Sequence, residues 1–372
     1  MHSPLRSFAF RRALLVAALA LSTAQAGAAT YCAASVTELQ NALSAAAASI
    51  DYDEIRLVRG TYANPSTFVY GSNNPGWIFL GGGWEPGCAA RTLDATLTVL
   101  DGGGTHQVLQ MAYTVQGAAA LAPRLAVENV TVQNGVASGF VRGGGISMAS
   151  FADAPAQAEL WVENVIVRNS SGYFAGGVDM YAVRGMARVV NSLFVGNSAP
   201  TSAFGHLAIT VNATEAGNGQ VAIVANDTFV DGTCAGSGGR GCGIYIGLPN
   251  GTRGDVLNSV FANNAIADIG VEKPNGTAGG ALFVDSTLAT TFGGNVTPTI
   301  VRPIVGAPGF VDAAGGNYRL RNDSRLLNRG LGTPFFYGYN GYDLDGGLRV
   351  RGPALDVGAY ENQVALLVDG FE

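Results

Sequence analysis

The stretch that decides the fold is LAVENVTVQN at residues 125–134, which returns as LWVENVIVRN at residues 160–169. Three later segments keep the same pattern: RVVNSLFVGN (188–197), IVANDTFVDG (223–232) and DVLNSVFANN (255–264). Each has an apolar residue, a polar pair that contains Asn, and then apolar residues two places apart. Self-similarity at a spacing of roughly 20–50 residues is typical of solenoids. The sequence therefore predicts a stack of similar coils.

The polar pairs predict a corner between two strands of each coil. Their first members are Glu128, Glu163, Asn191, Asn226 and Asn258, which lie 35, 28, 35 and 32 residues apart. Alternation at period two places the flanking apolar residues on one face. The residues expected to face the core are Val127, Val130, Val132, Val162, Val165, Val167, Val190, Leu193, Val195 and Leu257. Asn tolerates left-handed backbone angles, and stacked amides can bond between coils, so we expect an asparagine ladder that includes Asn191.

A glycine-rich element precedes a further apolar strand in several repeats, at Gly143–Ile146, Gly176–Val178 and Cys242–Ile244. With this additional strand, each repeat holds about three strands. No single coil can bury its own apolar face, so neighbouring coils must stack. The variable spacing argues against a propeller, and a period of two argues against a helical solenoid. We therefore predict an all-β chain that forms a right-handed parallel β-helix of about eight coils, each adding about 4.8 Å.

The first 26 residues predict a signal peptide. Arg6, Arg11 and Arg12 precede a short apolar run at 13–21, and Ala24–Ala26 supplies a small-x-small cleavage site. The run is too short to span a bilayer, and no later segment is long and apolar enough. We therefore expect export, a secreted or cell-surface location, and no integral membrane span after removal of the signal.

The rest of the chain divides into four parts. Residues 27–50 are expected to form an N-terminal cap, with a capping box at Ser35–Glu38 and a short helix that carries Leu39 and Leu43. Residues 51–300 are predicted to form the β-helix. Residues 301–361 lose the repeat and are interpreted as a C-terminal closing region, and 362–372 form a short tail.

Composition narrows the partners. Only 13% of residues are charged, acidic residues exceed basic ones by six, and there is no basic block, which argues against nucleic acid. Abundant glycine, 53 residues, suits β-structure with tight turns. Four cysteines in an exported chain indicate two disulfides. Cys234 and Cys242 are close enough to pair locally, which leaves Cys32 to pair with Cys88.

The end of the chain carries a more specific signature: Pro308–Asp312, Asn317–Leu320, Asp343–Gly346 and Asp356–Glu361. It resembles the choice-of-anchor Q domain of secreted bacterial proteins, and the repeats resemble those of the pectin-lyase-like superfamily. The resemblance implies a secreted or surface protein from a group that mostly lacks an established activity. A sorting anchor is expected after this domain, yet only residues 362–372 follow. They are either a sorting tag or a frayed terminus.

One exterior strand face offers candidate catalytic residues. If Ile146 and its equivalents point inward, then Ser147, Asp179, Ala208 and Tyr245 point outward in one column, with His206 on the same face and Arg184 in the following bend. A carboxylate, an imidazole and an arginine could abstract a proton beside a uronic carboxylate. Gly205–Leu207 only partly matches the Gly-His-Gly of polygalacturonase-like hydrolases, and no Asp pair precedes it. A mixed polar exterior is the alternative reading of Asp179, His206 and Arg184.

Tyrosines and one acidic loop supply the other candidates. Tyr245, Tyr339 and Tyr342 could stack on sugars. Asp343 and Asp345 could bind Ca²⁺, although Ala354 at the twelfth position excludes an EF-hand. No other cofactor is expected.

Two functions remain from the sequence. The first is a non-enzymatic, monomeric β-helix that binds or adheres to a polysaccharide or another surface. The alternative is a polysaccharide lyase or hydrolase that acts on a uronic-acid-containing polymer. The missing enzyme motifs favour the first.

Overall fold

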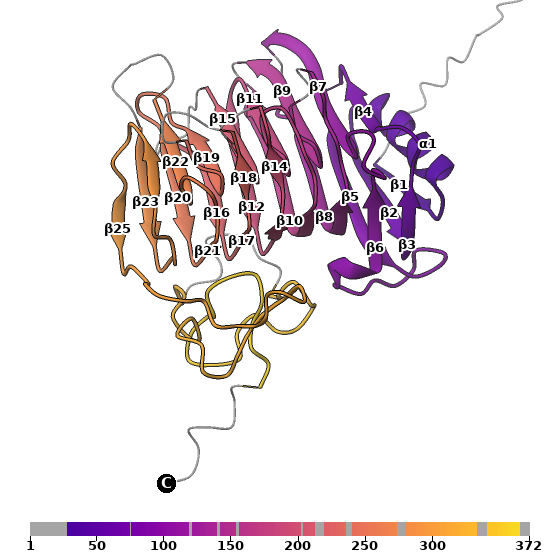
Figure 1. The fold of residues 1–372 in the computed structure, drawn as a ribbon. Helices are drawn as coiled ribbons and strands as arrows, with labels where there is room; N and C mark the ends of the chain where they lie inside the picture. The colour runs from indigo at the N-terminus through magenta and orange to yellow at the C-terminus, as the bar shows by residue number, and fades with distance from the viewer. Residues whose placement is uncertain are drawn as a thin grey trace, which may run out of the picture.

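The structure, a computed structural model, describes residues 28–364 apart from 75, 119–120, 140–141, 154–155, 202–203, 213–218, 236–239, 274–279 and 333–340. The expected signal peptide and residues 365–372 of the expected tail therefore lie outside the described residues. Parallel strands dominate and wind into stacked coils, which confirms the predicted all-β parallel β-helix (Figure 1). No helix in the described part of the chain has the length and apolar character needed to cross a membrane.

Two long parallel sheets form the walls of the solenoid. The main path of the first sheet is β1 (Ala29–Ala33), β2 (Tyr52–Val58), β5 (Trp77–Trp84), β8 (Arg124–Gln133), β10 (Ala158–Arg168), β12 (Gly185–Val190), β16 (Gln220–Ala225), β20 (Arg253–Leu257), β23 (Ala281–Asp285) and β25 (Thr299–Val301). Its branch beyond the corner adds β3 (Gly60–Ala63), β6 (Thr98–Asp101), β13 (Leu193–Val195), β17 (Thr228–Val230) and β21 (Val260–Ala262).

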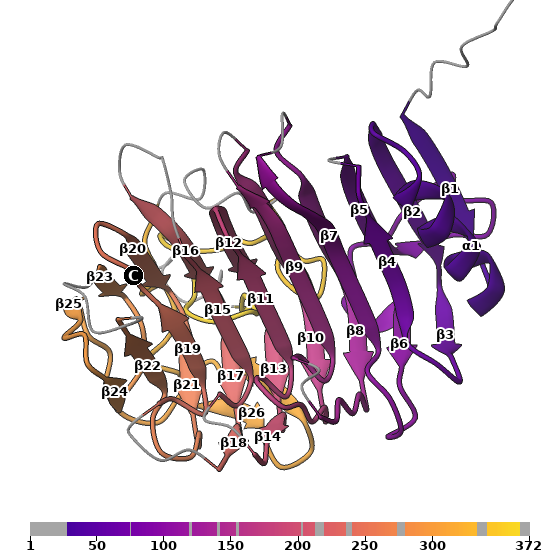
Figure 2. The ribbon, with the colours of Figure 1, turned by 90° about the horizontal axis from the view of Figure 1, so that it is seen from above.

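The second sheet holds eight strands, in agreement with the number of coils expected from the sequence. They are β4 (Phe68–Ser72), β7 (Leu109–Ala118), β9 (Ile146–Asp153), β11 (Val178–Ala182), β15 (Leu207–Val211), β19 (Ile244–Gly247), β22 (Ile269–Glu272) and β24 (Phe292–Gly294). Figure 2 shows them side by side in order along the solenoid. Two short strands at one bend, β14 (Ser198–Ala199) and β18 (Thr233–Cys234), pair separately.

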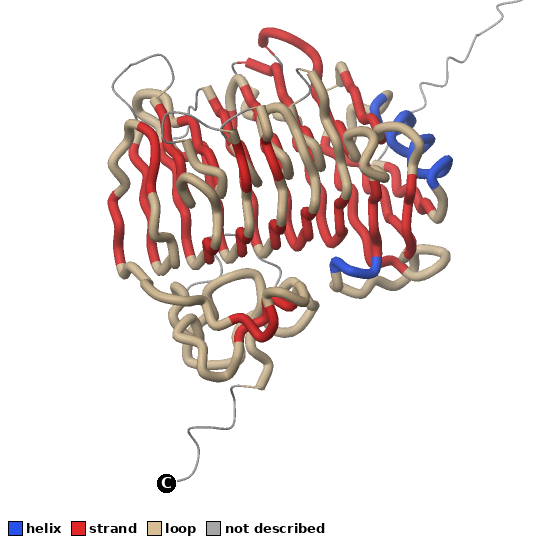
Figure 3. The backbone as a smooth tube through the Cα atoms, in the orientation of Figure 1, coloured by secondary structure: helices blue, strands red, loops and turns tan. Residues whose placement is uncertain are grey.

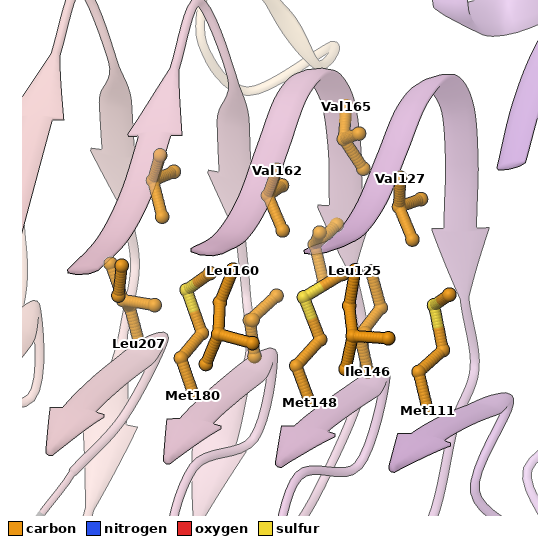
Figure 4. Packing of buried hydrophobic residues seen from close by; sticks show 14 of the residues in the cluster. Met111, Leu125, Val127, Ile146, Met148, Leu160, Val162, Val165, Met180 and Leu207 are labelled. Carbon is orange, nitrogen blue, oxygen red and sulfur yellow. The ribbon is translucent and has the colours of Figure 1, made fainter. Parts of the chain in front are cut away.

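The core lies between these walls. Like residues stack from coil to coil, as Met111, Met148 and Met180 do opposite Leu125 and Leu160 (Figure 4). All five are at most 1% exposed. Burial of each such side chain contributes about 1.5–3 kcal/mol relative to exposure. Hydrophobic burial therefore accumulates coil by coil along the axis.

A column of asparagines in the left-handed conformation turns the predicted corner. Asn129, Asn164, Asn191, Asn226 and Asn258 have φ between 47° and 60°. In the sheet, Glu163 pairs with Val190 and not with Asn191, so Asn191 is equivalent to Asn164. The predicted register is therefore wrong by one residue after the second repeat. The prediction aligned the first residue of every polar pair. In the sheet, the aligned residues are instead those that adopt the left-handed backbone angle.

This shift reverses the side chains that follow the corner, because a strand has a period of two. Phe194, Phe229 and Phe261 face the core, and their rings stack at centroid distances of 4.7 Å and 4.8 Å. Because of the same shift, four residues on either side of the corner that were predicted to face the core point outward instead. They are Val190, Leu193, Val195 and Leu257, which pack in two clusters outside the solenoid.

The side-chain amides of Asn258 and Asn191 in this column have different kinds of partner. The Asn258 amide donates to Oδ1 of Asn226 at 3.0 Å, which is the expected bond between coils. The Asn191 amide instead donates to the carbonyl of Tyr342 at 2.9 Å, so the prediction of a neighbouring coil as its partner is wrong. Asn258 Oδ1 also accepts from the Leu331 amide at 2.7 Å. The corner therefore holds the C-terminal region as well as its neighbouring coils.

The N-terminal cap forms as expected, with one addition. Helix α1 (Val36–Ala47) begins after Ser35, whose Oγ accepts from the Glu38 amide at 3.2 Å, and it buries Leu39 and Leu43. Before it, β1 pairs with β2 and so already belongs to the long sheet.

Both predicted disulfides are present. Cys32 joins Cys88 and Cys234 joins Cys242, with Cα–Cα distances of 5.8 Å and 5.4 Å. The first ties β1 to the loop after β5. The second lies at the bend before β19.

The region after β25 leaves the repeat, as expected, but it lies along one flank of the solenoid rather than over its last coil (Figure 1). It is mostly loop, with a single described hairpin of β26 (Phe310–Asp312) and β27 (Asn317–Leu320) (Figure 3). Its apolar side chains cover the outward residues of the corner, from Ala95 to Leu288. The three side chains of β25 remain exposed.

A buried arginine organises this region internally. Arg349 is 0% exposed, and its Nη2 donates to the carbonyls of Asp356 and Gly358 at 3.0 Å and 2.6 Å. Attachment to the solenoid uses the next backbone groups: the Gly358 amide donates to the Asn258 carbonyl at 2.8 Å, and the Ala359 amide donates to Thr228 Oγ1 at 3.0 Å.

Replacement of Asn258 by Ala tests the corner. We expect it to lower the free energy of unfolding by about 1–3 kcal/mol more than Asn263→Ala, because Oδ1 of the buried Asn226 and the partly buried Leu331 amide both lose their partner. Asn263 has the same backbone conformation, with φ 54°, but its side chain is exposed. Urea unfolding of both variants measures the difference, and equal losses would contradict the role of the amide.

Candidate functional site

The column predicted on the second sheet exists in the expected register. Asp179 pairs with Ser147 on one side and with Ala208 on the other, and Ala208 pairs with Tyr245. These side chains point away from the core, since their neighbours along each strand belong to it. They are nevertheless covered: Asp179 is 0% exposed and Tyr245 is 8% exposed.

The Asp179 carboxylate forms an ion pair with an arginine that was not a candidate from the sequence. Arg142 Nε donates to Asp179 Oδ2 at 2.5 Å, and Nη2 donates to Oδ1 at 3.2 Å. The guanidinium lies 4.3 Å from the Phe174 ring centroid. Burial raises the pKa of Asp179, while Arg142 opposes that shift. Asp179 is thus half of a covered ion pair and is closed to substrate.

Tyr245 lies under an aromatic cover rather than at the surface. Its ring stacks on Phe204 at 3.9 Å, and Phe204 lies 6.2 Å from Phe174. Arg240 covers Phe204 and forms an ion pair with Glu272 at 2.6 Å. Burial raises the pKa of Tyr245 to about 12. The ring has no free face for a sugar.

His206 does not lie on this face. It is 0% exposed, and its ring packs inside the solenoid against Phe194 and Phe229. Asn197 donates to Nδ1 at 3.0 Å. Burial lowers the pKa of His206 to about 3, so it is neutral at physiological pH. The expected placement is wrong because His206 precedes β15, where the alternation of strand side chains does not apply.

The third catalytic candidate is also engaged elsewhere. Arg184 lies in the bend after β11 and forms an ion pair with Asp153 at 3.7 Å. The structure therefore does not bring Asp179, His206 and Arg184 together.

The candidates in the C-terminal region have structural partners. Asp343 is fully buried, and its carboxylate accepts from the amides of Asp345, Gly347 and Glu361. Asp345 forms a bidentate ion pair with Arg319. Neither carboxylate is free for Ca²⁺, and the described residues contain no group of three or more His, Cys, Asp or Glu that could hold a metal ion. Tyr342 is 39% exposed, and Tyr339 lies outside the described residues.

A different surface presents aromatic rings to solvent. We call it the aromatic–arginine face and define it as Tyr52, Trp77, Phe79, Arg124 and Trp161, on the outer side of the long sheet. The sheet register builds it from β2, β5, β8 and β10, which lie side by side in Figure 1. Tyr52 pairs with Trp77 and Trp77 with Arg124, while Phe79 and Trp161 occupy the adjacent outward column.

Arg124 is the centre of this face. Its guanidinium lies 4.0 Å from the ring centroids of both Trp77 and Trp161, one on each neighbouring strand. Tyr52 stacks on Phe79 at 5.0 Å, and Phe79 meets Trp161 edge-on at 6.3 Å. The Trp77 indole N–H donates to the Ala122 carbonyl at 3.0 Å. Cation–π contacts and this hydrogen bond hold the rings in fixed orientations.

Two rings of the face remain open. Tyr52 is 42% exposed and Trp77 is 41% exposed. They line a shallow cavity of about 300 Å³ together with Ile50, Asp51, Leu121 and Ala122. Aromatic surface beside one carboxylate and an arginine suits a ligand that is flat and apolar on its faces and polar at its edges.

A largely buried ion pair borders the face. Arg188 lies 4.4 Å from the Trp161 ring centroid and 3.5 Å from a carboxylate oxygen of Glu163. Burial raises the pKa of Glu163 from an ordinary value of 4.5 to about 7, although Arg188 opposes the shift. Glu163 therefore titrates near neutral pH next to the aromatic rings.

Sequence reasoning missed this face because its members come from separate coils. Tyr52 and Trp161 are far apart in the chain, and each looks like an ordinary strand residue. The available signal was that Trp77 and Trp161 are two of only three tryptophans. Both fall on strands at positions that alternate with core residues.

In comparisons with known proteins, no protein-family model matches the chain, and no curated protein matches it significantly.

Glu163→Gln tests the shifted pKa in the ion pair with Arg188. The folded protein keeps the Glu163 proton up to about pH 7, whereas the unfolded chain releases it near pH 4.5. The free energy of unfolding should therefore fall as pH rises through this window, by an amount on the order of 1–3 kcal/mol. Urea unfolding at several pH values should show a flatter pH dependence for Glu163→Gln, even if the variant is less stable overall. An unchanged pH dependence would contradict the shifted pKa.

Proposed function

We propose that this protein is a non-enzymatic β-helix that binds polysaccharide through the aromatic–arginine face. The observation that carries the proposal is the pair of open rings: Trp77, which Arg124 holds in place, and Tyr52, which stacks on Phe79. Sugar rings have apolar faces that pack on aromatic rings and hydroxyl edges that bond to polar side chains. Asp51 lines the same cavity and supplies an acceptor.

Pre-ordered rings favour binding of this kind. Trp77 is fixed by its hydrogen bond to Ala122 and by Arg124, so little side-chain entropy is lost when a ligand packs on it. The exterior of a parallel sheet is also extended along the solenoid axis. A chain of sugars could therefore contact successive coils, and several weak contacts along one polymer add to useful affinity.

The lyase alternative has less support from the geometry. It requires an accessible base close to a group that neutralises the uronic carboxylate. Asp179 is covered and bound to Arg142, and His206 is inside the solenoid with a pKa of about 3. These observations favour the binding function among the two.

We also propose that the chain belongs with secreted pectin-lyase-like β-helices that carry a choice-of-anchor Q type region. Two disulfides support a location in an oxidising compartment. The signature residues of the C-terminal region have roles that suit a structural motif. Asp343 and Asp356 accept backbone amide bonds, and Glu361 accepts from the Asp356 amide at 3.0 Å.

Trp77→Ala tests the proposed function. We expect it to weaken retention on a recognised polysaccharide by about tenfold or more, because removal of a stacked aromatic costs about 1–3 kcal/mol at binding sites of this type. The measurement is affinity electrophoresis or glycan-array binding across a broad panel, with the melting curve recorded for each variant.

Tyr342→Ala is the matched control. Tyr342 is similarly exposed, at 39%, but lies in the C-terminal region. Loss of retention in Tyr342→Ala and not in Trp77→Ala would place binding elsewhere. On uronic polymers the same panel should show no rise in ultraviolet absorbance. A rise abolished by Asp179→Asn would establish the lyase function in its place.

A further inference from the structure

Three arginines line one cavity at the end of the solenoid opposite to the aromatic–arginine face. The cavity has a volume of about 420 Å³ and is lined by Arg302, Arg325, Arg329, Pro303, Ile304 and Val305. Arg302 directly follows β25, the last strand of the long sheet, whereas Tyr52 and Trp77 lie on β2 and β5 near its other end (Figure 1). The size falls within the range of about 300–1,000 Å³ that is common for small-molecule sites.

Arg302 occupies a backbone position that does not favour arginine. It has φ 46°, in the left-handed region in which the equivalent corner residues of earlier coils are asparagines such as Asn226 and Asn258. A residue with a long side chain is strained there, at a cost on the order of 1 kcal/mol. One edge of the guanidinium forms a bidentate pair with Asp285, with Nε–Oδ1 at 2.8 Å and Nη2–Oδ2 at 2.5 Å. The corner thus fixes Arg302 at the rim of the cavity.

Arg325 is also held in place. Its Nη1 donates to the Val305 carbonyl at 2.7 Å. The guanidinium lies against Gly306, where a Cβ would come within 2.6 Å of Nη1, and Gly306 itself has φ +105°. The missing side chain at Gly306 therefore makes room for the guanidinium beside the backbone.

The charge of the cavity is not balanced from within. Asp285 pairs with Arg302, but among the described residues neither Arg325 nor Arg329 forms an ion pair with a carboxylate. This concentration of positive charge occurs in a chain whose formal net charge is −6. Because arginine binds the oxygens of carboxylate, phosphate and sulfate in a bidentate manner, the cavity is complementary to a small oxyanion.

We propose that this cavity is a binding site for an oxyanion carried on a compact organic group, such as the carboxylate of a uronic acid or a phosphate ester. Arg325 and Arg329 bind the anion, Arg302 closes the rim, and Pro303, Ile304 and Val305 pack against the body of the ligand. The site does not depend on the proposed polysaccharide function, since no residue is shared with the aromatic–arginine face.

Isothermal titration of the full chain with three probes tests the site: galacturonate, inorganic phosphate and, as the uncharged control, galactose. We expect one anion per chain and no binding of galactose here. Arg325→Gln and Arg329→Gln should each weaken binding by about tenfold or more. The affinity of Arg325→Lys should lie between those of the unaltered protein and Arg325→Gln, because lysine keeps the positive charge but cannot form the two parallel hydrogen bonds of a guanidinium. Tighter binding of galacturonate identifies a sugar acid as the ligand class, and tighter binding of phosphate identifies a phosphoryl group.

Arg321→Gln is the matched control, since Arg321 is an exposed arginine of the same region that pairs with Asp323 and does not line this cavity. It should bind the anions as the unaltered protein does. The proposal is overturned if neither anion binds, if Arg321→Gln loses as much affinity as Arg325→Gln, or if Trp77→Ala abolishes anion binding. Melting curves of all variants, taken without ligand, establish that each one is folded.

Discussion

Every part of this structure depends on one backbone constraint: each coil must turn its corner at the same height as the coil before it. Parallel strands bond to both neighbours, so a corner that is out of step would leave buried amides and carbonyls without partners. The left-handed angle at Asn129, Asn164, Asn191, Asn226 and Asn258 meets this requirement at the same place in successive coils. Asparagine is suited to it because it tolerates the left-handed angle and its amide can bond to a neighbouring coil or to the C-terminal region.

The corner also explains why the C-terminal region lies where it does. After several of the left-handed residues the outward side chains are apolar, as at Ile166 and Leu193, and they form a hydrophobic strip along the flank. Such a strip would be exposed on an isolated solenoid. The C-terminal region covers it with Leu344 and Tyr360 and bonds to the corner itself through Gly358. Its role is thus to stabilise the side of the stack.

Much of the fold could be predicted from the sequence because repetition and cysteine pairing are local signals. The capping box at Ser35 and the pair Cys234–Cys242 could be read from a few adjacent residues. The register of the strands at the corner could not be predicted. The polar pairs Glu-Asn and Asn-Ser look alike in the sequence, but the left-handed residue is the second member of the first pair and the first member of the other. That ambiguity of a single residue decided whether Leu193 or Phe194 faces the core.

The functional surfaces were harder to predict for a related reason. Asp179 was placed correctly in its column, but its partner Arg142 lies 37 residues earlier, in a bend with no repeat to locate it. His206 was assigned by strand alternation although it precedes the strand. The aromatic–arginine face requires four strands in correct register before Trp77, Arg124 and Trp161 meet.

The exposed strand β25 has a consequence for the behaviour of the molecule in concentrated solution. A free strand edge can template the addition of another chain, and a parallel solenoid is already the kind of stack that could continue into a fibril. Here the last strand has only three residues, Thr299–Val301. Pro298 precedes it and Pro303 follows one residue after its end, so amide donors are missing on both sides of the edge. The charged Arg302 stands between the strand and the second proline. Together these features disfavour propagation of the stack from one molecule to the next.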